Sequence, residues 1–472
     1  MEGLEISEVN LSDLERTSRL DSEFYSKENL KIEELLHGLK TNVISNLTNV
    51  SDGNHMSISS NFQDTGIPYY RGQNIHSFFI EESSPICISE ETYNIGYLKR
   101  SHLKKGDVLL SIVGTIGGVA LVSTDNKATC NCKLAILRPS DISGFYLSAF
   151  LKSKYGQNQI QKFKRGAVQM GLILEDMNQI QVPILTQNFQ FKIEDLINLS
   201  KLCSDNSQLQ YAQAESLLLQ EIGLNDFKSS KEAVNVKSFS ESFAVSGRLD
   251  AEYYQKKYED VISKVVLQNH DKLSQLVSIS KSIEPGSANY ADEGLPFMRV
   301  ADYGKFGLTE PNKNVSLDFV SANADKVKKL KPKKGTILFS KDGSVGTAYH
   351  LREDFRGITS GAILHLKVKD ETKVIPEYLT LALNSKVVKM QAERDAGGSI
   401  ILHWRVGEIE NVVVPIIDFD KQKQIAELVE ESFKLKKQSE HLLEVAKTAV
   451  EVAIEQNEAK AMQYIVENTE LI

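Results

Sequence analysis

The chain has 472 residues, of which 41% are apolar and 25% are charged, so it can form several domains with ordinary hydrophobic cores. It contains no run of about 18 apolar residues, and its first five residues, Met-Glu-Gly-Leu-Glu, do not resemble a secretory signal. Neither a membrane span nor export is expected, and we predict a cytoplasmic protein. The four cysteines lack a paired metal-ligand spacing and are predicted to be reduced, structural thiols.

The net charge of −8 is unevenly distributed along the chain. Residues 41–185 have 13 Lys and Arg against 11 Asp and Glu (net +2), and residues 271–415 have 21 against 18 (net +3). The acidic excess lies in the remaining segments. This pattern permits contact with DNA through local basic patches, and it predicts that the chain alone binds DNA weakly.

The chain contains an internal repeat with an offset of about 230 residues. A repeat of this length is a whole domain with its connector, which indicates a molecule with pseudo-twofold symmetry. The repeated segments are Arg19–Tyr25 with Arg248–Tyr254, Gly66–Arg71 with Gly294–Arg299, Gly106–Ser111 with Gly335–Ser340, and Val182–Ile184 with Val414–Ile416.

In chain order, each copy begins with a predicted short amphipathic helix, over Arg19–Leu36 and Arg248–Val265. Two strands and a helix follow. Apolar and β-branched residues predict strands over 108–113 and 133–137, and helical spacing predicts a helix over 146–151. The second copy has the same order, with strands over 336–340 and 362–368 and a helix over 378–384.

After each Val-Pro segment the pattern becomes that of a long helix. Over residues 190–222 and 422–468, apolar or small residues recur in heptads, which is typical of a coiled coil. Serines occupy equivalent rungs, Ser200 with Ser432 and Ser207 with Ser439. Small residues at these rungs favour two helices that pack closely against each other, and we expect the pair to be antiparallel.

These patterns predict an α+β protein: two homologous mixed recognition domains in a pseudo-twofold arrangement, separated by two long antiparallel coiled-coil helices. We assign residues 1–185 to the first domain with its short helix and 186–227 to the central spacer helix. Residues 228–416 form the second domain with its leading helix, and 417–472 form the C-terminal spacer helix.

The sequence shows no complete catalytic motif. The Gly-x-x-x-x-Gly-Lys-Ser/Thr segment of a P-loop is missing, and the glycines after residues 113 and 342 do not have dinucleotide-binding spacing. Nine histidines occur without a metal-ligand spacing, and the single Trp404 is expected to be a core or interface anchor. We predict a non-catalytic chain with no cofactor and no metal.

The repeated boxes resemble the specificity subunit of Type I restriction–modification systems over essentially the whole chain. The carriers are the Arg-Leu-Asp-x-Glu-aromatic-Tyr box, the Pro-x-x-Arg segment and the Gly-x-x-Leu-x-Ser-x-x-Gly pattern, each present twice in the same order. In that family, two target-recognition domains each read one half of a split DNA sequence, and paired helices set the spacing. The resemblance implies double-stranded DNA and two methyltransferase subunits as partners, with restriction subunits as optional ones.

Candidate DNA contacts follow from side-chain chemistry. Arg, Gln and Asn match the edges of guanine and adenine, and lysines before strands suit phosphate contacts. Each candidate also has an ordinary interpretation, as a polar turn, a local ion pair or a solvated basic rim. The candidates are Arg71, Gln73, Asn74, Lys104, Lys105, Lys164, Arg165 and Gln169 in the first copy, and Arg299, Lys333, Lys334, Lys341, His403 and Arg405 in the second.

Two other functions stay open at this point. A twofold protein adaptor would use the same repeats to bind two protein subunits without reading DNA. An enzyme with an unfamiliar site is disfavoured because the two copies differ at each candidate catalytic position, as at Glu175-Asp176 against Gly407-Glu408.

Overall fold

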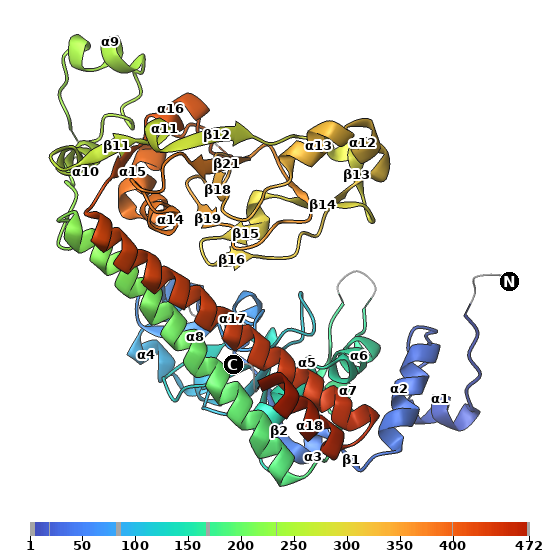
Figure 1. Cartoon of the computed structure of the whole chain (residues 1–472). Coiled ribbons are helices and arrows are strands. Elements are labelled where there is room, and N and C mark those ends of the chain that lie inside the picture. Colours follow the sequence, from blue (N-terminus) through green and yellow to red (C-terminus); the bar gives the residue numbers. More distant parts are fainter. Residues whose placement is uncertain are drawn as a thin grey trace. The chain divides into compact units, whose positions relative to one another are not determined.

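The computed structural model describes residues 5–17, 19–81, 86–166, 170–232, 234–398 and 400–469, with the backbone alone at 15–17 (Figure 1). The chain divides into two compact units. The first contains residues 1–204 together with 437–472, and the second contains residues 205–436. Each unit therefore combines one copy of the repeat with segments of both long helices.

The core of the first unit is an antiparallel sheet in the order β2-β9-β6-β7. Its strands are β2 (Thr48–Asp52), β9 (Leu134–Pro139), β6 (Val108–Ser111) and β7 (Val119–Leu121). All four residues of β6 are buried because the strand is central and is covered on both faces. The predicted strands over 108–113 and 133–137 are confirmed.

Two smaller sheets complete this copy, in the orders β3-β5-β4-β8 and β1-β10. Their strands are β3 (Phe62–Gln63), β5 (Ile86–Ile88), β4 (Ile67–Tyr70), β8 (Thr129–Cys130), β1 (Thr41–Val43) and β10 (Gln181–Pro183). The helices are α1 (Leu11–Thr17), α2 (Lys27–His37), α3 (Ile44–Leu47), α4 (Glu90–Tyr93), α5 (Gly144–Lys152), α6 (Lys154–Phe163) and α7 (Leu174–Met177). Helix α5, predicted over 146–151, packs on β7 and is buried over Gly144–Leu151.

The second unit repeats this arrangement, with a central sheet in the order β12-β21-β18-β19. Its sheets contain β12 (Val277–Lys281), β21 (Ile363–Val368), β18 (Ile337–Ser340), β19 (Ala348–His350), β13 (Tyr290–Ala291), β17 (Asn314–Val315), β14 (Leu295–Met298), β20 (Ile358–Thr359), β11 (His270–Lys272), β22 (Val413–Pro415), β15 (Tyr303–Gly304) and β16 (Gly307–Leu308). The helices are α9 (Phe243–Ser246), α10 (Lys256–Val266), α11 (Leu273–Leu276), α12 (Leu317–Ala322), α13 (Ala324–Leu330), α14 (Pro376–Asn384), α15 (Lys386–Asp395) and α16 (Val406–Glu410).

The two copies share individual hydrogen bonds as well as topology. The Tyr146 hydroxyl donates to the Pro183 carbonyl at 2.8 Å, and Tyr378 donates to Pro415 at 2.7 Å. The Gln159 side chain bonds both main-chain groups of Gln181, and Gln391 does the same with Val413. Because these pairs are buried and recur at equivalent positions, they hold the Val-Pro strand in the same place in each copy. The predicted fold class is confirmed.

The Arg-Leu-Asp box is not helical, so the predicted helix over Arg19–Leu36 is wrong over its first eight residues. Arg19 bonds both oxygens of Asp21 at 2.6 and 2.9 Å, and the Tyr25 hydroxyl donates to the Arg19 carbonyl. The helix begins only at Lys27, after the capping Ser26. The ion pair closes a turn that competes with helix formation. The second copy has the same turn, closed by the Arg248–Asp250 pair.

Helices α8 (Gln187–Glu221) and α17 (Phe419–Glu455) pack side by side and run antiparallel. In the first unit Ser200 of α8 faces Ser439 of α17, and in the second unit Ser207 of α8 faces Ser432 of α17. From the first pair to the second, the residue number increases along α8 and decreases along α17, as it must for antiparallel helices. Each pair carries a hydroxyl-to-carbonyl bond of 2.7–2.9 Å in addition to the contact between hydroxyls. At 35 residues and ~1.5 Å per residue, α8 is about 52 Å long.

The predicted C-terminal helix over 422–468 is interrupted. Helix α17 ends at Glu455, and α18 (Glu458–Thr469) begins after Asn457, whose side chain accepts a bond from the Lys460 N–H at 3.0 Å. Helix α18 lies against α17, because His441 contacts the Asn468 carbonyl at 2.9 Å. The heptad pattern does not predict this break, because an asparagine cap lies inside an otherwise periodic sequence. In the part of the chain that the structure describes, none of the helices is long and apolar enough to cross a membrane.

We expect Ser200→Leu to destabilise the first unit by about 1–3 kcal/mol, because a larger side chain overpacks a fully buried rung. Ser200→Ala, which removes only the hydroxyl bonds, should cost about 1 kcal/mol. Urea unfolding followed by circular dichroism gives both values, and Leu202→Ala on the exposed face of α8 is the control. A Ser200→Leu chain more stable than the natural one would contradict close packing at this rung.

The fold also predicts an acid-sensitive residue in the second unit. Burial lowers the pKa of His365 from 6.5 to about 4, and the ring bonds the Thr359 hydroxyl at 2.8 Å. The unfolded chain binds a proton at this residue below pH 6.5, and the folded chain does not until about pH 4. The stability present above pH 6.5 is therefore progressively lost as the pH falls towards 4.

Replacing this pair by the first-copy residues, as His365→Ile with Thr359→Cys, should flatten the fall in urea midpoint between pH 6.5 and 4. Ile136 and Cys130 occupy the equivalent positions and are fully buried. An unchanged pH dependence in this variant would show that other groups cause the acid sensitivity.

Candidate nucleic-acid interface

Equivalent turns present the lysine pairs just before the central strands β6 and β18. In the first copy the Asp107 N–H donates to the Lys104 carbonyl at 3.0 Å, and in the second Thr336 donates to Lys333 at 3.0 Å. Gly106 and Gly335 close these turns with φ of 89° and 85°, a conformation that favours glycine. The turns place the four predicted lysines, Lys104, Lys105, Lys333 and Lys334, at exposed positions.

Nearby carboxylates differ between the two turns. Asp107 is buried, and burial raises its pKa, although the Lys104 N–H and Arg138 favour its charged form. In the second copy the exposed Asp354 pairs with the Lys333 ammonium at 3.0 Å. Among the described residues Lys104, Lys105 and Lys334 have no ion-pair partner. They are the lysines of this set that a phosphate can reach without first displacing a carboxylate.

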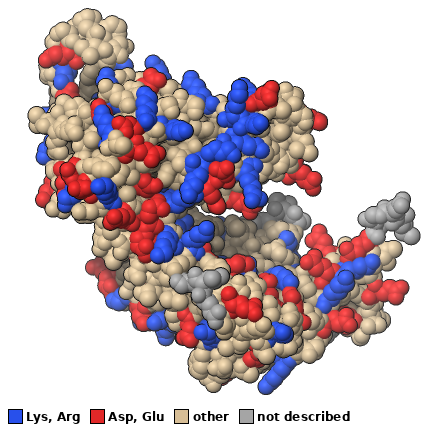
Figure 2. Space-filling view, viewed as in Figure 1, with Lys and Arg blue, Asp and Glu red and all other residues tan. Residues whose placement is uncertain are grey.

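A larger basic surface lies around α13 in the second unit. Figure 2 shows Lys and Arg side chains gathered over this helix and the segment after it. The exposed lysines of this stretch are Lys326, Lys328, Lys329, Lys333 and Lys334. Their density within nine residues makes this the most cationic part of the described chain, and it suits contact with a phosphate backbone.

The predicted base-reading segments form the same short turn in both copies. The Arg71 N–H donates to Asn74 Oδ1 at 2.9 Å around η2 (Gly72–Asn74), and the Arg299 N–H donates to Asp302 Oδ2 at 2.8 Å around η6 (Val300–Asp302). Asn74 is only 5% exposed, and its amide also donates to the Glu81 carbonyl. The structure therefore gives Asn74 a capping role within the turn.

The outer residues of this turn differ. Gln73 is exposed in the first copy, and its counterpart Ala301 is exposed in the second. Arg71 has a buried Nε without a hydrogen-bond partner, and it forms no ion pair within the described residues. Arg299 instead contacts Asn312 at 2.7 Å and Asp302 at 3.5 Å. Arg71 and Gln73 are thus available to a ligand, whereas Arg299 would have to exchange partners.

Two further loops, at 165–171 and 397–403, are closed by paired main-chain bonds. Arg165 exchanges bonds with Gly171 at 2.7 Å, and Gly397 exchanges bonds with His403. Lys164 contacts the Gln161 side chain, and Gln169 lies outside the described residues. Arg165 pairs with the carboxylate of Asp176, which is only 2% exposed. This ion pair is the ordinary interpretation of Arg165, and it gives the buried Asp176 a structural partner.

In the second copy the turn after β18 lies beside the loop 397–403, joined by a bridge between Asp342 and His403. Asp342 accepts from both Lys341 and His403, the latter at 2.9 Å. Arg405 is exposed and has no described ion-pair partner, whereas Trp404 is 1% exposed and packs on Phe339. The prediction of Trp404 as a core anchor is confirmed.

The tip of this loop carries a feature that the analysis of charges missed. Ile400, Ile401 and Leu402 are 95%, 55% and 40% exposed, next to Lys341, His403 and Arg405. Three adjacent exposed apolar side chains are unusual on a free surface and indicate a contact region. The signal was present in the sequence as an apolar run inside a glycine-rich loop.

The four cysteines form no disulfides. Burial raises the pKa of the Cys130 and Cys203 thiols, so both are protonated at neutral pH. They are poor nucleophiles and poor metal ligands in that form.

Comparison with known protein families finds a match in the second half of the chain. Residues 272–445 match the family model of the Type I restriction modification DNA specificity domain. This part of the chain belongs to that family. The resemblance to specificity subunits, based on the repeated motifs, is thereby confirmed over these residues. The matched region runs from the end of β11 into α17, so the specificity domain includes its packed helix.

Two solved structures to which the chain is similar are specificity subunits. One is the Type-I restriction-modification system S subunit from M. genitalium, at 16% identity and a TM-score of 0.40, over 89% of this chain and 95% of that one. Another is the HsdS subunit from Thermoanaerobacter tengcongensis, at 15% identity and a TM-score of 0.29, over 89% and 97%. No curated protein is detectably similar in sequence.

The Arg165–Asp176 pair makes a prediction that separates structural from DNA-contacting residues. Arg165→Ala leaves a buried carboxylate without its partner and should lower the unfolding free energy by about 1–3 kcal/mol in the absence of DNA. Lys164→Ala, one residue away, should change it by less than about 0.5 kcal/mol. Urea unfolding of the free chain measures both. Equal stability of the two variants would show that Arg165 has no structural role.

Proposed function

We propose that the chain is the DNA-specificity subunit of a Type I restriction–modification complex, in which each copy of the repeat reads one part of a two-part DNA target. The observation that carries this proposal is a single scaffold, present twice, with different side chains at its exposed positions. A protein that reads two different half-sites needs this combination.

The turns η2 and η6 combine a common backbone with different exposed side chains. Both copies keep the arginine and the buried capping side chain, Asn74 or Asp302, so the turn has the same backbone. The exposed residue between them changes from Gln73 to Ala301. A glutamine bonds two groups of adenine, whereas an alanine offers only apolar contact, such as with the thymine methyl group. A wrong base pair typically costs ~1–3 kcal/mol, so a few such positions discriminate effectively.

The lysine turns supply the second component, which is independent of base sequence. Lys104, Lys105, Lys333 and Lys334 stand at equivalent positions, and the α13 lysines add to the second copy. Contacts of this kind position a protein on the duplex and make its affinity fall with salt. The net charge of −8 supports weak DNA binding by the chain alone.

The chain's role is recognition, and its partners supply the chemistry. By family resemblance, two methyltransferase subunits per chain dock on the helices and carry the methyl donor. Restriction subunits are optional partners. The chain itself needs no cofactor for this role. Its charged candidates Arg165, Lys341 and His403 are engaged in local ion pairs rather than arranged around a substrate.

A chain with two identical recognition domains tests the proposal. The strand pairs β1-β10 and β11-β22 end at Thr41 with Pro183 and at His270 with Pro415, which are equivalent exchange boundaries. Replacing residues 270–415 by 41–183 should convert the methylated motif into one with two identical half-sites. Sequencing of modified bases in cells that express the methyltransferase complex reads out the motif.

The reciprocal chain, with 41–183 replaced by 270–415, is the matched control and should duplicate the other half-site. A motif that changes in both parts in either chain would refute independent reading. Another outcome is a complex that methylates DNA with an affinity that does not depend on this chain. That result would favour the protein-adaptor function instead.

A further inference from the structure

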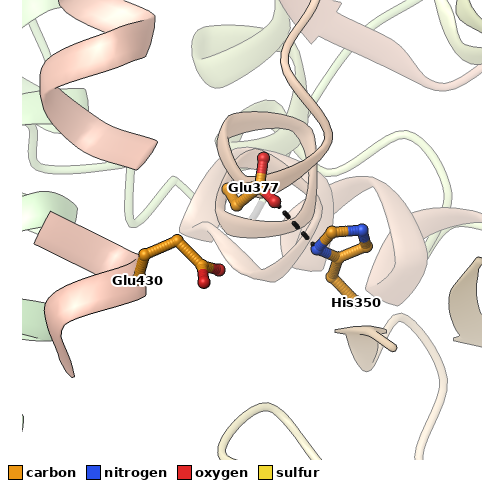
Figure 3. A group of neighbouring side chains, drawn as sticks. All are labelled: His350, Glu377 and Glu430. Atoms are coloured by element: carbon orange, nitrogen blue, oxygen red, sulfur yellow. Dashed lines mark ion pairs between the residues drawn. The ribbon is translucent and has the colours of Figure 1, made fainter. Parts of the chain in front are cut away.

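Three side chains far apart in the sequence converge in the second unit: His350 at the end of β19, Glu377 in the first turn of α14 and Glu430 in α17. Figure 3 shows both carboxylates pointing towards the His350 ring from separate helices. One ligand atom from each residue lies within 4.8 Å of the other two. We propose that these three residues form a binding site for one divalent transition-metal ion, of which Zn²⁺ is the best match to the ligands.

The state of His350 is the observation that points to a ligand. The residue is 8% exposed, and neither ring nitrogen has a hydrogen-bond partner among the described residues. Nδ1 lies 3.1 Å from Glu377 Oε1, which is an ion-pair contact. A buried imidazole without a hydrogen bond is costly, and a metal ion on a ring nitrogen removes that cost.

The other buried histidine of this sheet provides a contrast. His365 is also 8% exposed, but its Nε2 bonds the Thr359 hydroxyl at 2.8 Å. The domain therefore satisfies a buried imidazole where it needs no ion. His350 differs in having carboxylates where His365 has a hydroxyl.

The distances fit a tetrahedral ion. Zn²⁺ binds imidazole nitrogen and carboxylate oxygen at ~2.0–2.1 Å, which places neighbouring ligand atoms about 3.3 Å apart. His350 and Glu377 are already at 3.1 Å. The side chain of Glu430 is 50% exposed and can swing inwards to supply the third ligand, leaving the fourth position for water.

The repeat supplies an internal comparison. The registers of β7 and β19 make Leu121 the counterpart of His350, and the Tyr146–Tyr378 equivalence makes Phe145 the counterpart of Glu377. Asn198 corresponds to Glu430. The first copy thus packs the same junction with Leu121 and Phe145, both buried. Since the fold does not need polar residues here, the three ligands of the second copy call for a separate role.

Cationic side chains near the site limit its affinity for a metal ion. Arg352 bonds Glu430 at 2.8 Å and the His350 carbonyl at 3.2 Å, while its guanidinium lies over the Phe433 ring. Lys305, which lines the adjacent small cavity, is paired with Glu215 at 2.8 Å. With two carboxylates against one arginine the site keeps a net negative charge, so we expect micromolar rather than nanomolar affinity.

A bound ion would join β19 and α14 to α17, and so would brace the specificity domain against its own long helix. This role does not depend on the proposed DNA function. It predicts that Zn²⁺ raises the thermal midpoint of the chain, because the ion binds the folded state only.

Isothermal titration of the full-length chain with Zn²⁺ tests the site, with equilibrium dialysis and elemental analysis to count bound ions. We expect one ion per chain at this site, with the affinity reduced at least tenfold in Glu430→Gln, which changes one half-exposed ligand and leaves the core intact. His350→Leu, which restores the first-copy residue, should abolish binding. His365→Gln is the matched control and should keep both the stoichiometry and the rise in thermal midpoint.

Two results would overturn the proposal. One is an absence of Zn²⁺ binding by the natural chain, which would mean that water alone occupies the junction. The other is binding that is equal in the natural, Glu430→Gln and His350→Leu chains, which would place the ion elsewhere, as at a cysteine.

Discussion

The structure depends on the close approach of α8 and α17 at two serine rungs. Ser200 with Ser439 and Ser207 with Ser432 are buried and bonded to each other, so the helix backbones are near enough for hydroxyl-to-carbonyl bonds. Leucine at these positions would drive the helices apart. Helix α17 follows the second copy, and because the pairing is antiparallel its C-terminal end belongs to the first unit. Helix α8 follows the first copy, and its C-terminal end belongs to the second unit. Each copy is thus completed by a helix that the other copy supplies.

Within each unit the residues divide into those that define the scaffold and those that vary. The tyrosine and glutamine bonds to the Val-Pro strand, the arginine–aspartate turn and the glycines before the central strand recur in both copies. The exposed positions next to these features differ, as Gln73 and Ala301 show. Duplication of a scaffold followed by change at its exposed turns is a direct route to a protein that recognises two sequences, as we propose for this chain.

Much of the fold was predictable because its signals are local and present twice. The central strands, the helix after them and the heptads each follow from residue spacing. Because the chain contains two copies, each of these predictions is made twice from different residues. The helix predicted over Arg19–Leu36 is wrong at Arg19–Tyr25, because a side-chain ion pair closes a turn where the apolar spacing also suits a helix. The break before α18 does not follow from the heptad spacing, because a single asparagine cap sets it.

The candidate sites were less predictable, because a side chain's role depends on partners distant in sequence. The charge of Arg165 makes it a candidate DNA contact, yet it forms an ion pair with Asp176. The amide of Asn74 makes it a candidate too, yet that amide caps a turn. His350, Glu377 and Glu430 are separated by 27 and 53 residues, so no spacing rule could group them. Only the packing of α14 and α17 against β19 brings them together.

The central claim is that a duplicated reader recognises a divided DNA sequence. Mapping modified bases in the genome of cells that express the natural chain with its methyltransferase tests this claim most directly. We predict one motif made of two different short blocks separated by a fixed number of unspecified base pairs. A single uninterrupted motif, or methylation that is independent of this chain, would contradict it.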